Sequence, residues 1–261
     1  MSTTSTASAA LSFHAMLPRV YELKAMLTDP SHPDAYFQDF EDGLKKYKTK
    51  LGAFVKLERQ LAVLDENAWC DLKERAAVHL VSQTRGQGRG WQPLFDVFSE
   101  ARGYGYLAGV GCTGIHFIKR TKGKTPDLGA MQDSRTVLCE VKTLNISKDE
   151  AEKRHRVSKG DVIGGKVDVH VGEGFLAKLT STLAHAVGQL DGRDPQREAR
   201  RIIFTVVHFD DWVGDYQPEY FAQMDDHLLR NPVEGAELVF CAGSNLFERT
   251  FTMRSATVLP E

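Results

Sequence analysis

Cysteine is scarce in this chain, and the spacing of the few that occur excludes two kinds of stabilising site. Cys70, Cys112, Cys139 and Cys241 lie far apart, and no Cys-x-x-Cys pair occurs. Neither a structural zinc site nor a disulfide framework is therefore predicted. We interpret the cysteines as buried free thiols in a reducing compartment.

Long apolar runs and a strong net charge are also missing. No stretch approaches the roughly 20 apolar residues that span a bilayer, and the opening MSTTSTASAALSFHAM lacks the basic start and apolar core of a signal peptide. We therefore expect a cytoplasmic protein with no membrane partner. The formal net charge of -2 confines any polyanion-binding surface to a local patch.

Several motifs of other enzyme classes are absent as well. The glycine-rich segment TRGQGRG at 84–90 precedes a helical pattern but follows no strand, which excludes a dinucleotide-binding turn. The nine histidines show no HExxH or paired ligand spacing. Ser158 and Ser181 do not lie in the context of a nucleophile elbow. The chain therefore carries no signature of these three kinds of site.

The first part of the chain has a helical pattern. Between about residues 15 and 82, apolar residues such as Tyr36, Phe40 and Leu44 recur at three- and four-residue steps. Breaks at Asp29-Pro30 and Asp65-Glu66 divide this pattern into about three helices. The predicted regions are a disordered N-terminus at 1–12, a helical region at 13–83, and a linker or mobile loop at 84–90.

Beyond the linker, short β-branched or apolar runs alternate with helical patterns. A helix is predicted to begin near Pro93, because proline is favoured in the first turn, and a longer helix is predicted at 175–190. The mixture predicts an α/β or α+β domain at 90–261. Its predicted strands lie at 115–118, 137–141, 202–207 and 238–241.

The segment VLCEVK carries opposite charges in the strongest strand pattern of the chain. Side chains alternate along a strand, so Glu140 and Lys142 project side by side with Leu138, whereas Cys139 and Val141 occupy the other face. Burying a lone charge costs on the order of several kcal/mol unless the charge is paired or bound to a metal. The alternative interpretation is an edge strand with a solvated ion pair.

A second acidic residue precedes this strand. Asp127 follows Pro126 and lies 140 − 127 = 13 positions before Glu140, which is long enough for the chain to turn back and pair two strands. Two converging carboxylates repel each other, and a hard divalent cation removes that repulsion while it gains oxygen ligands. The pattern favours Mg²⁺ over Zn²⁺.

Pro126-Asp127 followed by Glu140-Val141-Lys142 resembles the signature of the PD-(D/E)XK nuclease superfamily. Members of this superfamily share a mixed sheet flanked by helices, the restriction-endonuclease-like core. The order of predicted elements is similar over roughly residues 90–210: a helix with Glu100, a strand, the Pro-Asp turn, the charged strand, a long helix and a further strand. The resemblance therefore implies an α/β fold of this kind.

The acid-x-Lys pattern alone is not specific. Glu22-Leu23-Lys24 and Asp71-Leu72-Lys73 also match it, and Pro33-Asp34 supplies a second Pro-Asp pair. Both triplets lie in helical patterns, where residues i and i+2 do not share a face. Neither triplet can therefore build the same site.

The resemblance implies a role for each residue of the signature. The metal would polarise a phosphate oxygen and lower the pKa of a water molecule. Lys142 would orient that water or help to deprotonate it, and would offset charge developing on phosphorus. Gln189 resembles a polar position that some members use near the site. One or two Mg²⁺ ions, for which Mn²⁺ is expected to substitute, would be held by Asp127, Glu140, the Val141 carbonyl and Glu100.

Contacts to a polyanion are predicted in two basic segments, one before Asp127 and one after the charged strand. Each phosphate that these side chains neutralise would steepen the salt dependence of binding. The second segment also carries acidic residues, so a solvated loop of mixed charge is the alternative interpretation. The predicted contacts are Lys119, Arg120, Lys122, Lys124, Lys153, Arg154, Arg156 and Lys159.

Together these patterns predict a metal-dependent endonuclease that hydrolyses phosphodiester bonds, with DNA favoured over RNA as the substrate. The N-terminal helices would recognise the substrate, a partner protein or a second copy of the chain. The alternative is a non-catalytic nuclease-like domain that serves as a binding or scaffold module. A third interpretation is that the motif occurs by chance in an α+β protein with another role. The presence of Asp127, Glu140 and Lys142 together favours the enzyme.

Overall fold

The computed structural model divides the chain into two compact units, residues 1–108 and residues 109–261. Among the residues that it describes, no helix is long and apolar enough to cross a membrane. The predicted disordered N-terminus and the predicted loop at 84–90 lie outside the described residues. The described residues are 13–32, 35–81, 91–119, 125–147, 149–150, 152–153, 156, 169–210, 216–243 and 253–259.

The first unit is helical. The break predicted at Asp65 is where α5 begins, because the Asp65 carboxylate accepts a hydrogen bond from the Ala68 N–H at 2.8 Å. A further break that the periodicity did not predict falls at Tyr47, whose extended backbone separates α3 from α4. The helices are α2 (Pro18–Ala25), α3 (Phe40–Lys46), α4 (Lys48–Ala62), α5 (Glu66–Ala77) and α6 (Gln92–Gly109).

Two charged side chains join α2 to α4 in this unit. The buried Glu58 accepts hydrogen bonds from the backbone N–H groups of Arg19 and Val20, at 3.2 and 3.0 Å. The Arg19 guanidinium in turn donates to the carbonyls of Leu61 and Leu64 at the end of α4. The first N–H groups and last carbonyls of a helix have no partner within the helix. Glu58 and Arg19 satisfy these groups across the helix pair.

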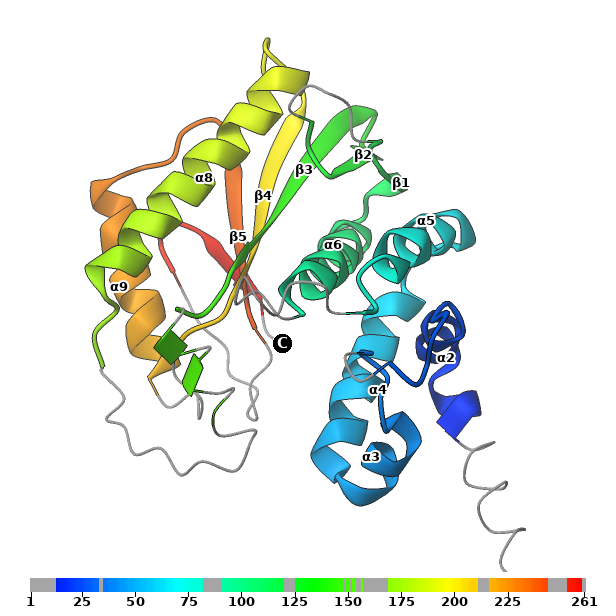
Figure 1. The fold of residues 1–261 in the computed structure, drawn as a ribbon. Coiled ribbons are helices and arrows are strands. Elements are labelled where there is room, and N and C mark those ends of the chain that lie inside the picture. Colours follow the sequence, from blue (N-terminus) through cyan, green and yellow to red (C-terminus); the bar gives the residue numbers. More distant parts are fainter. Residues whose placement is uncertain are drawn as a thin grey trace, which may run out of the picture. The chain divides into compact units, whose positions relative to one another are not determined.

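The second unit contains a mixed α/β fold built on a six-stranded sheet in the order β1-β2-β3-β4-β5-β6 (Figure 1). The first three strands pair antiparallel, and β3 to β6 pair parallel. The helix α8 (Glu173–Arg193) lies between β3 and β4 in sequence, and α9 (Gln217–Arg230) lies between β4 and β5. The strands are β1 (Thr113–Phe117), β2 (Leu128–Gln132), β3 (Arg135–Leu144), β4 (Arg200–Val207), β5 (Glu237–Ala242) and β6 (Thr257–Leu259).

A tight turn at Asp133-Ser134 sets the pairing of β2 with β3. Both residues have positive φ, 47° and 66°, and this left-handed conformation matches the twist of a two-residue hairpin. The hairpin places Gln132 opposite Arg135 and Leu128 opposite Cys139. It therefore fixes which residues of β3 lie beside the start of β2.

The helices α8 and α9 pack on the same face of the sheet, as Figure 1 shows. Leu138 and Leu144 of β3 belong to the core that these helices cover, and so do Ile203 and Val207 of β4. Side chains alternate along a strand, so every even-numbered residue of β3 from Leu138 to Leu144 faces these helices. The same is true of the odd-numbered residues of β4 from Ile203 to Val207. This is the face that carries Glu140 and Lys142.

Candidate active site on the charged strand

The charged pair lies inside the sheet, on a strand bordered on both sides. β3 pairs with β2 on one side and with β4 on the other, so the interpretation as a solvated edge strand is wrong. Glu140 is 1% exposed, and the side chain of Lys142 is 22% exposed. A carboxylate this deeply buried is stable only with charged or hydrogen-bonding partners.

Lys142 and Gln189 connect the charged strand to its surroundings. The Lys142 ammonium contacts Glu140 Oε1 and donates to Gln189 Oε1 at 2.7 Å. The amide of Gln189 donates to the carbonyl of Thr125 at 3.3 Å. Gln189 precedes the buried Leu190 on α8 and therefore lies at the edge of the apolar stripe of that helix. It joins Lys142 to the segment immediately before Pro126.

Asp127 lies across from Glu140 at the start of β2. Leu128 pairs with Cys139, so the next pair outward in this antiparallel register is Asp127 with Glu140. The Asp127 carbonyl accepts a hydrogen bond from the Ile118 N–H at 2.9 Å, and Asp127 Oδ2 accepts one from the Val141 N–H at 2.9 Å. These two bonds fix the backbone and the carboxylate of Asp127 beside the charged strand.

The Val141 carbonyl points toward the same place. The N–H and C=O of one strand residue point to the same side of the strand, and the Val141 N–H is directed at Asp127. Val141 also lies beyond Cys139, the last residue of β3 that pairs with β2. Its carbonyl oxygen is therefore directed to the side on which the Asp127 carboxylate lies.

The buried Cys139 thiol lies near the carboxylates of Asp127 and Glu140. Burial raises the pKa of Cys139 well above its usual value, and the carboxylates of Asp127 and Glu140 raise it further. A thiol feels two carboxylates in this way only when both lie near it. Cys139 itself is protonated and inert at neutral pH, because only the thiolate is a metal ligand or nucleophile.

The oxygen atoms at this place fit Mg²⁺ better than Zn²⁺. Two carboxylates and a peptide carbonyl are hard donors, and Mg²⁺ is usually held by one or two carboxylates together with water and substrate phosphate. A carboxylate offers about four lone-pair sites, so it can accept a hydrogen bond from a protein group and bind a cation at the same time. Among the described residues, no three His, Cys, Asp or Glu side chains form a group that could hold a metal ion.

Glu100 lies in the helical unit, on α6. It is 5% exposed and contacts the Arg75 guanidinium, which also binds Asp71 at 2.6 Å. Arginine remains charged at every physiological pH, so Glu100 is paired with a permanent cation inside its own unit. A part for Glu100 in metal binding stays a prediction.

The predicted nucleic-acid contacts are described only in part. Lys119, Lys153 and Arg156 are exposed, as a contact to phosphate requires. Each could reach a polyanion without the desolvation that a buried cation would suffer. The remaining predicted contacts lie outside the described residues; they are Arg120, Lys122, Lys124, Arg154 and Lys159.

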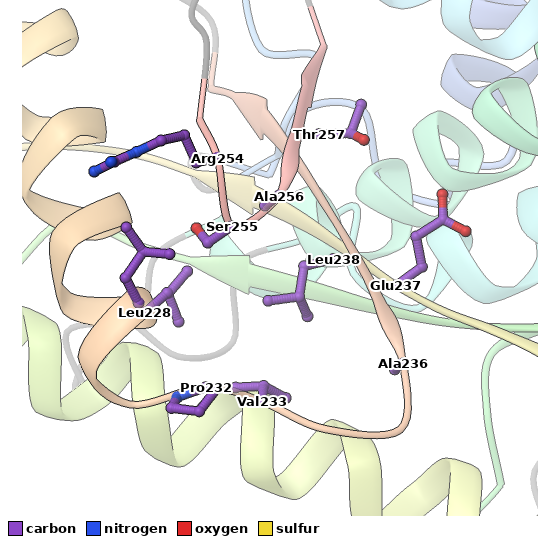
Figure 2. A pocket seen from close by; sticks show the side chains of 11 residues that line it. Leu228, Pro232, Val233, Ala236, Glu237, Leu238, Arg254, Ser255, Ala256 and Thr257 are labelled. Atoms are coloured by element: carbon purple, nitrogen blue, oxygen red, sulfur yellow. The ribbon is translucent and has the colours of Figure 1, made fainter.

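A pocket of about 510 Å³ that the sequence did not predict lies between the end of α9, the start of β5 and residues 254–257 (Figure 2). Figure 2 shows Leu228, Val233 and Leu238 at its apolar side. The Asp225 carboxylate accepts hydrogen bonds from the backbone N–H groups of Arg254 and Ser255 and so holds the rim in place. None of the predicted site residues lines this pocket.

Comparison of the chain with protein-family models, with curated proteins and with solved structures found no match. The geometry around β3 and the sequence signature are therefore the two observations on which a function can be proposed. They concern the same residues, Asp127, Glu140 and Lys142.

Proposed function

We propose that the protein is a metal-dependent endonuclease that hydrolyses phosphodiester bonds, with DNA favoured over RNA. The observation that carries the proposal is the arrangement of Asp127 and Glu140 across β2 and β3, with Lys142 on the same face as Glu140. The element order α6-β1-β2-β3-α8-β4 also agrees with the restriction-endonuclease-like core that the signature implies.

The carboxylates of Asp127 and Glu140 and the Val141 carbonyl would hold the cation. Bound there, Mg²⁺ would polarise a phosphate oxygen and lower the pKa of a water molecule. In the reaction, the water oxygen forms a bond to phosphorus, the bond from phosphorus to the leaving sugar oxygen breaks, and that oxygen takes up a proton. No covalent bond to the protein forms.

Lys142 would act on the attacking water and on the phosphate. Its ammonium donates hydrogen bonds to oxygen atoms, so it can orient the water and offset the charge that develops on phosphorus. Gln189 holds the ammonium from the α8 side at 2.7 Å. Because Lys142 is only partly exposed, its charge is screened less by solvent than that of a surface lysine.

The remaining predicted residues complete the proposal. The exposed cations Lys119, Lys153 and Arg156 would contact the backbone of the nucleic acid. Each phosphate contact would add to the salt dependence of binding. The helical unit would recognise the substrate, a partner protein or a second copy of the chain.

One observation favours a second function. The buried Glu140 pairs with Lys142, and a buried ion pair of this kind can be structural and take no part in a reaction. A nuclease-like scaffold or nucleic-acid-binding module is therefore the second candidate. It differs from the enzyme in binding nucleic acid without hydrolysing it.

The test is cleavage of plasmid, linear and single-stranded DNA and of RNA, each with Mg²⁺, Mn²⁺ or EDTA. Wild type is compared with Lys142→Ala and Asp127→Asn, and Lys73→Ala serves as the matched control, because Lys73 belongs to an acid-x-Lys triplet of the helical unit and pairs with Glu22. Thermal unfolding of each variant establishes that it is folded in the assay.

Metal-dependent cleavage by wild type and Lys73→Ala, lost in the other two variants, supports the nuclease. Binding of nucleic acid without cleavage of any substrate supports the scaffold. Cleavage that persists in folded Lys142→Ala and Asp127→Asn would show that the reaction takes place elsewhere.

A further inference from the structure

Thr205 is a buried polar residue in the middle of β4. Its exposed fraction is 0%, and its hydroxyl Oγ1 has no hydrogen-bond partner among the described residues. Most buried polar groups in proteins are hydrogen-bonded, so a buried hydroxyl without a partner in one state of a protein calls for a physical explanation. A valine would fill the same space without the cost of desolvating a hydroxyl.

The register of the sheet places Thr205 beside Lys142. The two residues are partners in the parallel pairing of β3 and β4, so their side chains stand on the same face, about 4.8 Å apart along the sheet. On its other side Thr205 is the partner of Phe240, and along β4 it lies between Ile203 and Val207. The four nearest residues to Thr205 on this face are therefore Lys142, Phe240, Ile203 and Val207, and Lys142 is the polar one among them.

The contacts of Lys142 explain why an additional acceptor is needed. Its ammonium has three N–H donors, and in the structure it contacts Glu140 Oε1 and Gln189 Oε1. A divalent cation bound by Glu140 competes with the ammonium for that carboxylate, since both carry positive charge. When the cation binds, Lys142 loses part of its contact with Glu140 and needs another oxygen on the same face.

We infer that Thr205 is a positioning residue for Lys142: its hydroxyl accepts a hydrogen bond from the Lys142 ammonium when Glu140 turns to the cation. The inference rests on the proposed function, because it concerns the metal-bound state of the same site. Thr205 touches neither substrate nor metal in this account. It keeps the ammonium on the sheet face next to the scissile phosphate.

The experiment compares Thr205→Val, which keeps the shape and removes the hydroxyl, with Thr205→Ser, which keeps the hydroxyl. Thr143→Val on the opposite face of β3 is the matched control. Loss of one hydrogen bond to a charged group is expected to lower kcat of Thr205→Val about tenfold with KM unchanged. Thr205→Ser and Thr143→Val are expected to stay within about twofold of wild type, and the melting temperature of Thr205→Val is expected to equal or exceed that of wild type.

A second readout separates this inference from the proposed function. In protein labelled with ¹⁵N-lysine, the Lys142 ammonium signal, assigned by its loss in Lys142→Ala, is recorded with and without Mg²⁺. We expect the signal to remain visible with Mg²⁺ in wild type and Thr205→Ser and to be lost by exchange with water in Thr205→Val. That pattern supports Thr205 even if wild type cleaves no substrate, which would refute only the nuclease.

An unchanged kcat and an unchanged Lys142 signal in Thr205→Val would overturn the inference, even if wild type is an active nuclease. A fall in kcat that Thr205→Ser shares with Thr205→Val would also overturn it. Such a result would show that the shape of the side chain matters and that the hydroxyl does not.

Discussion

The two units of this protein use the same acid-x-Lys pattern in different ways. In the helical unit the acid and the lysine of one triplet do not pair: Glu22 binds Lys73 of the other triplet at 2.7 Å, and Lys24 contacts Glu41. In the sheet unit Lys142 contacts the acid of its own triplet. The difference follows from the repeat of the backbone, because i and i+2 share a face in a strand and diverge in a helix.

Burial separates the two kinds of pair as well. The Glu22 side chain is 47% exposed, whereas that of Glu140 is 1% exposed, although their lysine partners are similarly accessible. Water screens the attraction between Glu22 and Lys73, whereas the stability of the buried Glu140–Lys142 pair depends on the protein groups around it. The secondary structure around a short motif therefore decides whether the motif can form a chemical site.

The largest expected effect is the loss of cleavage in Glu140→Gln. The amide keeps the shape of the side chain but lacks the charge that holds a cation beside Asp127, so we expect Mg²⁺-dependent cleavage to fall at least about 100-fold. The matched change Glu22→Gln in the helical unit is expected to leave the rate unchanged. Similar rates for the two variants in a plasmid-nicking assay would remove the distinction between the triplets.

The second expected effect concerns stability. Lys142→Ala leaves Glu140 buried without its ammonium, and breaking a buried pair in this way costs about 3–5 kcal/mol. We expect urea unfolding to show a loss of this size, and added Mg²⁺ to recover more stability in Lys142→Ala than in wild type, because the cation replaces the missing charge. An equal gain from Mg²⁺ in both proteins would place the cation away from Glu140.

A smaller effect is expected for Gln189→Ala. The variant removes the hydrogen bonds to Lys142 and to the Thr125 carbonyl, and we expect kcat to fall about five- to tenfold as the ammonium loses its second anchor. Gln223→Ala is the control, because the amide of Gln223 on α9 likewise makes one hydrogen bond through its oxygen, from the Val171 N–H, and one through its nitrogen, to the Val169 carbonyl. Equal losses in the two variants would assign Gln189 a role in folding alone.

The smallest effect is expected for Lys73→Ala. Hydrogen bonding from Lys73 lowers the pKa of Glu22, so the pair stabilises the folded state above the unfolded pKa of a glutamate, about 4.3, and this stabilisation is lost as the pH falls through the folded pKa. We expect a loss below about 1 kcal/mol at pH 7 that vanishes in acid. The free energy of unfolding is measured with urea at pH 7 and in acid. An equal loss of stability in Lys73→Ala under the two conditions would contradict the ion-pair explanation.

The central strands and the long helix were predictable because their sequence patterns are strong. The predicted strands at 137–141, 202–207 and 238–241 lie within β3, β4 and β5, and the helix predicted at 175–190 lies within α8. Dense β-branched residues and a sustained helical period leave little choice of conformation. The structure extends β3, β5 and α8 at both ends, and β4 at its start alone.

Other elements carried too little signal or were defined by pairing. β2, with the sequence LGAMQ, has weak strand propensity and exists because the turn at Asp133-Ser134 lays it against β3. β6 has three residues and is a strand only by its pairing with β5. The helix α9 was not predicted, although apolar residues such as Phe221, Met224 and Leu228 recur in it at helical spacing.

Within the candidate site, the pairing of Asp127 with Glu140 across one short connection was predictable, and contacts to more distant elements of the sequence were not. The alternation of Glu140 and Lys142 follows from strand geometry alone. The position of Thr205 beside Lys142 depends on the register of β3 with β4, and the bridge made by Gln189 depends on where α8 crosses the sheet. A single polar residue in the apolar run RIIFTVV was the available signal for Thr205.

Cation binding between Asp127 and Glu140 can be observed in an anomalous difference map of crystals soaked in Mn²⁺. We expect a peak within coordination distance of the Asp127 and Glu140 carboxylates and the Val141 carbonyl, and we expect it to be missing in Glu140→Gln. A map without a peak between these carboxylates at saturating Mn²⁺, or a peak that persists unchanged in Glu140→Gln, would contradict this expectation.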